Sequence, residues 1–392
     1  MKFKTGIVGR LAVAIVIGVA VGYFAPGFIV RILNSFGGTF GQFIRFFVPF
    51  IVIGLVTPAI AETGKGAGKL LLATMGIAYA STLFAGGFAY GVSEFIFPRV
   101  LEKSLTGAIG AKEFPAFFVF EIQPVMDITT ALVMSFVLGL SMVATDMPYM
   151  RNVFDEMRDA VSLTIKSVVL PLLPVYILTV MADLTASGKL AIIGGGCLRI
   201  MLVAIAVTLS ILVMQYIAAG LIARRNPFRL LWNMLPAYLT GLGCCSSAAT
   251  LPVTLRQTRS NKVSRKVADL VIPLCSNVHL AGSMANMVVY TAGFIVLAGG
   301  AISFWQYAQF MFLLSIIAVA SPGIPGGVVL ASGSIAESVL GFSPERYALV
   351  IATYMALDGM GTACNLTGDG AIAVVVDRFF GKRRRKNVKK AV

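Results

Sequence analysis

Long apolar stretches separated by short polar segments fill the first half of the chain. Each stretch has enough residues to cross a lipid bilayer as a helix with some tilt. They cover residues 7–24, 38–61, 69–97, 115–145, 160–183 and 190–223. This pattern predicts an all-α polytopic membrane protein, because one globular core of this size could not bury so many apolar residues.

The second half of the sequence departs from this pattern at two places. The apolar segment from Leu230 to Leu255 has clusters of arginine and lysine at both ends. Basic residues prefer the cytoplasmic side, so we expect a hairpin that enters and leaves on that side. The segment from Phe304 to Leu340 is interrupted at 321–327 by two prolines and three glycines. Such residues end a helix, which predicts a second hairpin that enters from the outer side.

A predicted crossing follows each hairpin, at about residues 267–297 and 347–376. The order is therefore hairpin and helix from one side, then hairpin and helix from the other, which is an inverted repeat. Secondary transporters use broken helices in such repeats to present backbone groups to a substrate near the middle of the membrane.

Composition supports the membrane assignment and indicates the orientation. Of the 392 residues, 58% are hydrophobic and 12% are charged, whereas soluble domains have roughly 25% charged residues. This excludes a soluble enzyme. The net charge of +15 comes from basic residues in short segments between apolar stretches, a distribution that orients helices and does not indicate nucleic-acid binding. We expect a multi-pass protein of the cell (plasma or inner) membrane with both termini in the cytoplasm.

Four polar residues lie on one face of the last predicted crossing. Asp358, Thr362, Asn365 and Asp369 follow one another at helical spacing, which confines them to an arc of about 60°. A carboxylate inside a membrane is costly unless it is paired or hydrated. The stripe therefore predicts a cationic ligand or a water-filled site. The alternative is that these side chains only hydrogen-bond to neighbouring helices.

Two further features bear on the ligand. His279 is the only histidine in the chain, and it could either carry a proton or donate a hydrogen bond to a carbonyl. A helix that begins near Ser247 to Thr250, at the tip of the first hairpin, would direct unpaired N–H groups and a positive dipole end toward a carboxylate. Such an anion receptor opposite the acidic stripe suits a zwitterionic α-amino acid.

At these residues the sequence resembles the dicarboxylate/amino acid:cation symporter family, the glutamate-transporter homologues. The similarity extends over essentially the whole chain and is most specific in the serine-rich tip with Thr250–Thr254, in Pro322–Gly326 and in Asn365–Asp369. The resemblance implies eight transmembrane helices plus two re-entrant helical hairpins in each protomer of a homotrimer. It also implies an elevator mechanism, in which a transport domain slides across the membrane along a scaffold.

The resemblance further implies boundaries along the chain. Scaffold helices 1 and 2 would occupy residues 1–66, and scaffold helices 4 and 5 would occupy residues 99–186. Helix 3, at 67–98, would belong to the transport domain. The rest of that domain, at 187–378, would hold helix 6, the first hairpin, helix 7, the second hairpin and helix 8. Residues 379–392 would form a basic cytoplasmic tail.

Carried over to matching positions, the resemblance implies a substrate site formed by both hairpins and the last helix. Asp358 would bind the amino group, Asn365 and the first tip would bind the α-carboxylate, and Ile324 at the second tip would act as a lid. The implied substrate-binding residues are Ser246, Ser247, Ile324, Asp358, Gly361, Thr362 and Asn365.

Sodium sites are implied next to the substrate. Asp369 and Asn365 would form one site with a backbone carbonyl near His279, and backbone oxygens near Leu280 and at the second tip would form another. Sodium would therefore be the coupling ion, with a proton as the alternative or additional ion.

Four positions bear on the number of sodium ions and on the charge of the substrate. Ser81 and Thr82 resemble part of a third sodium site. However, the family motif Asn-Met-Asp-Gly-Thr has Ala281 in place of its aspartate here, which argues against a complete third site. Acidic-substrate members have an arginine where this chain has Gly361, so no cation is present there to pair with a side-chain carboxylate.

We therefore predict a secondary active symporter that couples a Na⁺ gradient, an H⁺ gradient or both to uptake of a small neutral amino acid, without an organic cofactor. One alternative is a dicarboxylate or acidic amino acid symporter that recruits another cation, such as Arg199. A non-transporting membrane sensor and an ion-conducting pore are alternatives outside transport. The sequence shows no nucleophile and base pair, metal cluster or phosphate loop, so we do not expect an enzyme.

Overall fold

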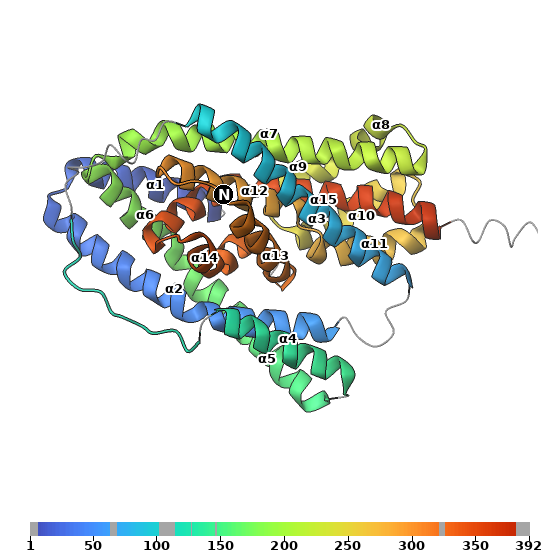
Figure 1. The fold of residues 1–392 in the computed structure, drawn as a ribbon, viewed down its shortest axis with the longest axis horizontal. Helices are drawn as coiled ribbons and strands as arrows, with labels where there is room; N and C mark the ends of the chain where they lie inside the picture. The colour runs from blue at the N-terminus through green and yellow to red at the C-terminus, as the bar shows by residue number, and fades with distance from the viewer. Residues whose placement is uncertain are drawn as a thin grey trace, which may run out of the picture.

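The chain folds into long helices that run side by side along the molecule (Figure 1). The computed structural model describes residues 7–62, 69–101, 114–126, 128–145, 147–320 and 326–381. Most of these described residues are helical, and none of them lies in a strand. The expectation of an all-α fold is therefore confirmed.

The first half of the chain contains most of the long helices. They are α1 (Ile7–Phe24), α2 (Gly27–Glu62), α3 (Lys69–Val100), α4 (Ile128–Ala144), α5 (Pro148–Thr164), α6 (Leu170–Ala186) and α7 (Lys189–Ala223). A π-helical segment, η2 (Ile165–Val169), joins α5 to α6 without a break. The helix that we expected at 160–183 is therefore longer, because it continues from Pro148.

The second half contains shorter helices before one long final helix. They are α8 (Pro227–Asn233), α9 (Leu235–Cys244), α10 (Ser247–Ser260), α11 (Arg265–Val278), α12 (Ala281–Leu297), α13 (Phe304–Ala320), α14 (Gly327–Leu340) and α15 (Pro344–Phe380). In the described part of the chain, five spans are long and apolar enough to cross a membrane. These spans are Gly27–Pro58, Lys69–Val100, Pro148–Ala186, Gly194–Ala223 and Arg265–Leu297.

The helices pack in two groups. Helices α1, α2, α4, α5 and α6 contact one another, and a second group contains α3, α7, α9, α11, α12 and α15. Figure 1 shows α12 and α15 in the middle of the molecule, with α7 along one flank and α2, α4 and α5 along the other. The first group falls within the residues expected to form the scaffold, although the division into fixed and moving domains stays a prediction.

One predicted crossing is wrong in its first part. The stretch 115–145 forms a helix only from Ile128, and residues 114–126 are non-helical. Polar side chains of α2 satisfy the backbone of this segment: Asn34 Nδ2 donates to the Phe114 carbonyl at 2.7 Å, and the Phe117 N–H donates to Ser35 Oγ at 2.9 Å. Backbone polar groups need partners, and side chains of α2 supply some of them to this non-helical segment.

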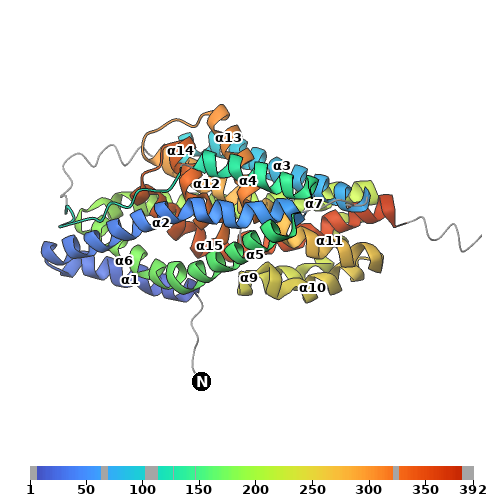
Figure 2. The ribbon, with the colours of Figure 1, turned by 90° about the horizontal axis from the view of Figure 1, so that it is seen from below.

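The segment after α7 reverses direction, as a hairpin requires. Arg225 Nη1 donates to the Asn261 carbonyl at 2.6 Å, and Asn261 Nδ2 donates to the Leu230 carbonyl at 2.9 Å. The start and end of the α9–α10 segment therefore lie at the same end of the molecule. A second reversal joins α13 to α14, which pack against each other. Figure 2 shows the two hairpins on opposite sides of α12 and α15. The membrane side from which each hairpin enters stays a prediction.

The crossing expected at 267–297 is interrupted in its middle. His279 and Leu280 leave the helical conformation, so α11 ends at Val278 and α12 begins at Ala281. Side chains of other helices accept hydrogen bonds from the exposed backbone: the Leu280 N–H donates to Thr82 Oγ1 at 3.2 Å, and the Gly282 N–H donates to Asn365 Oδ1 at 2.8 Å. These contacts satisfy donors at the start of α12 that no helical carbonyl can reach.

Close packing of α12 on α15 predicts a strong effect of the Gly282→Ala substitution. An added Cβ would lie 2.5 Å from the Gly361 carbonyl oxygen and 2.7 Å from the Cys364 Cβ. Such overpacking costs about 1–3 kcal/mol, so we expect a lower midpoint of thermal unfolding in detergent. Gly87→Ala is the matched control, since no atom lies within 4 Å of its added Cβ. Equal midpoints for the two variants would contradict this packing.

Candidate functional site

Residues predicted to bind substrate come together in one pocket. Asp358, Thr362 and Asn365 of α15 line it together with Ser247 at the start of α10 and Leu280 at the helix break. The second hairpin contributes residues of α13 and α14. Three residues of the polar stripe of the last helix therefore face a cavity, whereas Asp369 does not line it, so the stripe is not used solely to hold neighbouring helices.

Asp358 is the acidic group of this pocket. Its side chain is 4% exposed, and its Oδ2 accepts a hydrogen bond from the Gly326 N–H at 2.9 Å, immediately before α14. The Tyr354 hydroxyl lies within hydrogen-bonding reach of Asp358 and of Ser283. A buried carboxylate is stable only with such donors or with a cationic partner, so Asp358 is suited to receive an ammonium group.

The tip of the first hairpin rests on α15 beside Asp358. A Cβ at Gly359 would lie 2.3 Å from the Leu242 carbonyl oxygen, so the end of α9 touches the backbone of α15. Helix α10 then begins at Ser247 and also packs against α15. Ser246 precedes this helix, and its carbonyl accepts a hydrogen bond from Thr250 Oγ1 at 3.0 Å. The positive end of α10 and the Asp358 carboxylate thus face one pocket.

Asn365 holds the helix break as well as lining the pocket. Its Oδ1 accepts hydrogen bonds from the Gly282 N–H at 2.8 Å and from the Ser283 N–H at 3.3 Å. Its Nδ2 donates to Ser283 Oγ at 3.0 Å. The amide has a second N–H hydrogen that such a bond does not use, so Asn365 can both fix α12 and donate to a ligand.

His279 and Asp369 form a fully buried pair behind the pocket. His279 Nδ1 lies 2.9 Å from Asp369 Oδ1, and both side chains are 0% exposed. His279 Nε2 lies 3.0 Å from Ser81 Oγ and 3.2 Å from Gln215 Nε2. With a hydrogen on Nδ1, the imidazole can donate to Asp369 while Nε2 accepts from Ser81 or Gln215. Sequence reasoning did not identify Gln215, which sits in the apolar pattern of α7.

The residues proposed to bind sodium are partly engaged by the protein. Thr82 Oγ1 donates to the Ala78 carbonyl at 3.0 Å and accepts from the Leu280 N–H, and Ser81 Oγ accepts from Gln215 at 3.0 Å. By contrast, Asp369 Oδ2 is buried and has no hydrogen-bond partner among the described residues. Carboxylate and backbone oxygens are the ligands that hard cations prefer. The fit to a cation is therefore best at Asp369.

Three other residues named from the sequence do not contribute to the pocket among the described residues. Ile324, the expected lid, lies outside the described residues. Gly361 faces α12 at its close contact with Gly282. Arg199, considered as a cation for an acidic substrate, donates to the Val100 carbonyl at 2.7 Å in an exposed contact and does not line the pocket. That geometry opposes the Arg199 alternative.

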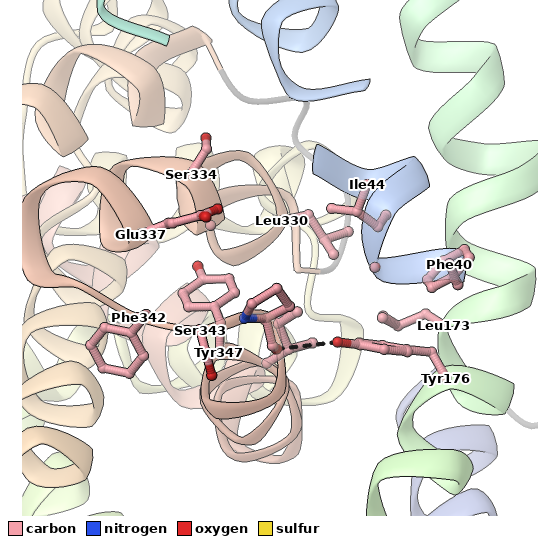
Figure 3. A pocket seen from close by; sticks show the side chains of 14 residues that line it. Phe40, Ile44, Leu173, Tyr176, Leu330, Ser334, Glu337, Phe342, Ser343 and Tyr347 are labelled. Atoms are coloured by element: carbon pink, nitrogen blue, oxygen red, sulfur yellow. Dashed lines mark hydrogen bonds between the residues drawn. The ribbon is translucent and has the colours of Figure 1, made fainter. Parts of the chain in front are cut away.

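A second cavity lies between the first packing group and helices α14 and α15 (Figure 3). Phe40, Leu173 and Tyr176 line it from α2 and α6, and Leu330 and Tyr347 line it from α14 and α15. The Tyr176 hydroxyl donates across the boundary to the Pro344 carbonyl at 3.2 Å. Because most of its lining is apolar and it contains none of the predicted site residues, we assign the site to the pocket at Asp358.

Comparison with known protein families identifies the group to which the chain belongs. The model described as "Sodium:dicarboxylate symporter family" matches residues 7–379. The chain belongs to this family. This confirms the resemblance seen in the sequence motifs. Together with the apolar helical spans, membership in a transporter family makes the chain an integral membrane protein.

Individual relatives in this family are transporters of amino acids by name. The chain is 25% identical to serine/threonine transporter SstT of Streptococcus agalactiae serotype III (strain NEM316), over 97% of this chain and 98% of that protein. It is 22% identical to SstT of Acinetobacter baylyi, over 96% of this chain and 98% of that protein. Excitatory amino acid transporter 3 of Mus musculus is 29% identical over 41% of this chain and 31% of that protein.

Proposed function

We propose that this family member is a secondary active symporter that uses a sodium gradient to take up a small neutral amino acid. The observation that carries the proposal is the pairing of the Asp358 carboxylate with the start of α10 on one pocket. Asp358 would bind the substrate ammonium group. The N–H groups at Ser246 and Ser247, with Asn365 Nδ2, would bind the α-carboxylate.

The lining of the pocket favours a neutral side chain. No lysine, arginine or histidine occurs among the described residues that line it. A second carboxylate on the substrate would therefore be buried without a cation, which is strongly unfavourable. Thr362, which lines the pocket, would border the substrate side chain. The names of the SstT relatives support the same substrate class.

The coupling ion is proposed from the buried acidic oxygen behind the pocket. Asp369 Oδ2 and backbone oxygens at the helix break of His279 and Leu280 would bind one sodium ion, and the Leu280 region with the second hairpin would bind another. Ser81 and Thr82 would contribute to a third ion only if other oxygens replaced the missing side chain at Ala281. Transport would follow the elevator mechanism of a homotrimer, with both termini in the cytoplasm.

A ligand screen by thermal unfolding tests the proposed substrate and ion together. Serine, threonine, alanine, glutamate and succinate would be added to the purified protein in sodium or in choline chloride. A ligand that binds only the folded protein stabilises it more, the higher its concentration is relative to its dissociation constant. We expect the neutral amino acids to raise the unfolding midpoint in sodium and to have little effect in choline. A larger shift with glutamate or succinate would contradict the proposal.

A further inference from the structure

A chain of polar contacts leads from α3 and α7 to the Asp369 carboxylate. Gln215 Nε2 of α7 donates to Ser81 Oγ of α3 at 3.0 Å and lies 3.2 Å from His279 Nε2. Ser81 Oγ lies 3.0 Å from the same imidazole nitrogen. At the other side of the ring, His279 Nδ1 lies 2.9 Å from Asp369 Oδ1. The two contacts at Nε2 therefore hold the imidazole with Nδ1 facing Asp369.

The imidazole engages only one oxygen of the carboxylate. Asp369 Oδ2 has no hydrogen-bond partner among the described residues, although the side chain is 0% exposed. A buried carboxylate oxygen without a donor is unfavourable unless a cation pairs with it. By holding Oδ1, His279 thus fixes the direction in which Oδ2 can receive a cation.

His279 also belongs to the helix break whose backbone oxygens are proposed to bind the same ion. Its backbone is extended, with φ −97° and ψ 98°, and it ends α11. The side-chain contacts tie this non-helical residue to α3, α7 and α15. One imidazole therefore sets the position of the carboxylate relative to the backbone of the break.

Gln215 has a defined place against α15. A Cβ at Gly368 would lie 2.6 Å from Gln215 Oε1 and 2.7 Å from His279 Cε1. The next residue of α7, Tyr216, donates through its hydroxyl to the Thr367 carbonyl at 2.7 Å. The amide and the imidazole are therefore packed side by side on the backbone that immediately precedes Asp369.

We propose that Gln215 and His279 are positioning residues for the sodium ion at Asp369. Gln215 orients the imidazole, and the imidazole orients the carboxylate and the helix break, while neither side chain binds the ion. This inference rests on the proposed function and extends it from the ion's ligands to the residues that hold them. Loss of such an outer hydrogen bond typically weakens metal binding 10- to 100-fold.

The Gln215→Met variant tests the role of the amide, because methionine has a similar length and no amide. We expect the sodium concentration for half-maximal serine binding to rise about tenfold. The serine dissociation constant at saturating sodium should stay at the wild-type value, because the substrate contacts are intact. Titration calorimetry at a series of sodium concentrations measures both quantities. An unchanged sodium requirement, or an equal loss of serine affinity at saturating sodium, would overturn the inference.

Thr208→Val is the matched control on the same helix. Thr208 is 2% exposed, and its hydroxyl donates to the carbonyls of Ala204 and Ile205 within α7. Its loss leaves the contacts of His279 in place, so both quantities should equal those of the wild type. A sodium requirement that rises equally in Thr208→Val and Gln215→Met would show a general effect of α7 and overturn the inference.

A double variant tests whether Gln215 acts through His279. His279→Leu removes both ring nitrogens and should also raise the sodium requirement about tenfold. Residues that act through one another are not additive, so adding Gln215→Met to His279→Leu should cause no further rise. A further tenfold rise in the double variant would overturn the assignment of Gln215 as a residue that orients the imidazole.

Gly368→Ala provides the measurement if these variants do not fold. The added methyl group would displace Gln215 and His279 without removing any polar atom, so the sodium requirement should rise in the same direction. An unchanged requirement in a folded Gly368→Ala protein would overturn the inference and leave the proposed function intact. Serine binding by the wild type that does not depend on sodium would overturn both.

Discussion

The Asp358→Asn variant is expected to bind serine at least 30-fold more weakly than the wild type and to lose uptake. Asparagine keeps the shape of the side chain and an oxygen for the Gly326 N–H. It lacks the negative charge that would pair with the substrate ammonium group. Removing one member of a buried charge pair costs about 2–5 kcal/mol, which corresponds to roughly 30-fold or more in affinity. Titration calorimetry in sodium measures this loss.

Two controls make the result specific to the ammonium contact. Asp269→Asn removes a carboxylate that is 43% exposed and pairs with Arg259 and Arg265. Exposed pairs contribute little, so this variant should bind serine like the wild type. 3-Hydroxypropanoate is serine without its amino group. It should bind the wild type weakly, and its affinity should not fall in the Asp358→Asn variant. Wild-type serine affinity in Asp358→Asn would show that the ammonium group lies elsewhere.

The Asp369→Asn variant is expected to raise the sodium concentration for half-maximal serine binding by at least about tenfold. The substitution replaces one carboxylate oxygen by an N–H₂ donor and removes the charge. One oxygen of Asp369 already accepts from His279, and the other has no partner among the described residues. The loss should therefore appear as a shift of the sodium titration to higher sodium concentrations. The titration is followed by the thermal unfolding midpoint at a fixed serine concentration.

Asp377→Asn is the matched control for this variant. Asp377 lies on the same helix, and its carboxylate accepts from the Ser264 N–H at 3.1 Å and from Ser264 Oγ at 2.6 Å. It does not touch the His279 network, so its sodium dependence should equal that of the wild type. A sodium titration that is the same in Asp369→Asn and Asp377→Asn would exclude Asp369 as a cation ligand.

The fold and the pocket were predictable where local rules apply. Apolar stretches of membrane length correctly predicted helices, except that the stretch 115–145 is helical only from Ile128. Basic clusters at both ends of one apolar segment predicted its reversal, and the structure joins those ends through Arg225 and Asn261. The spacing of Asp358, Thr362 and Asn365 predicted one polar helix face, and that face lines the pocket.

The remaining features depend on contacts between distant segments. The non-helical segment 114–126 is held by side chains of α2 that lie about eighty residues earlier in the chain. No local sequence pattern indicates such distant partners. Gln215 joins the His279 network because α7 packs against α15. Asn286 is an isolated polar residue in an apolar helix, so its place beside Gly361 follows only from the packing of α12 on α15.

The most direct test of sodium-coupled neutral amino acid transport is accumulation of radiolabelled serine in proteoliposomes that contain the purified protein. With an inward sodium gradient, serine should accumulate above its external concentration. Collapsing the sodium gradient should abolish accumulation, whereas collapsing a proton gradient should not. Accumulation that survives the loss of both gradients would contradict the proposed coupling. Serine binding without uptake would identify a sensor, and current without substrate would identify a pore.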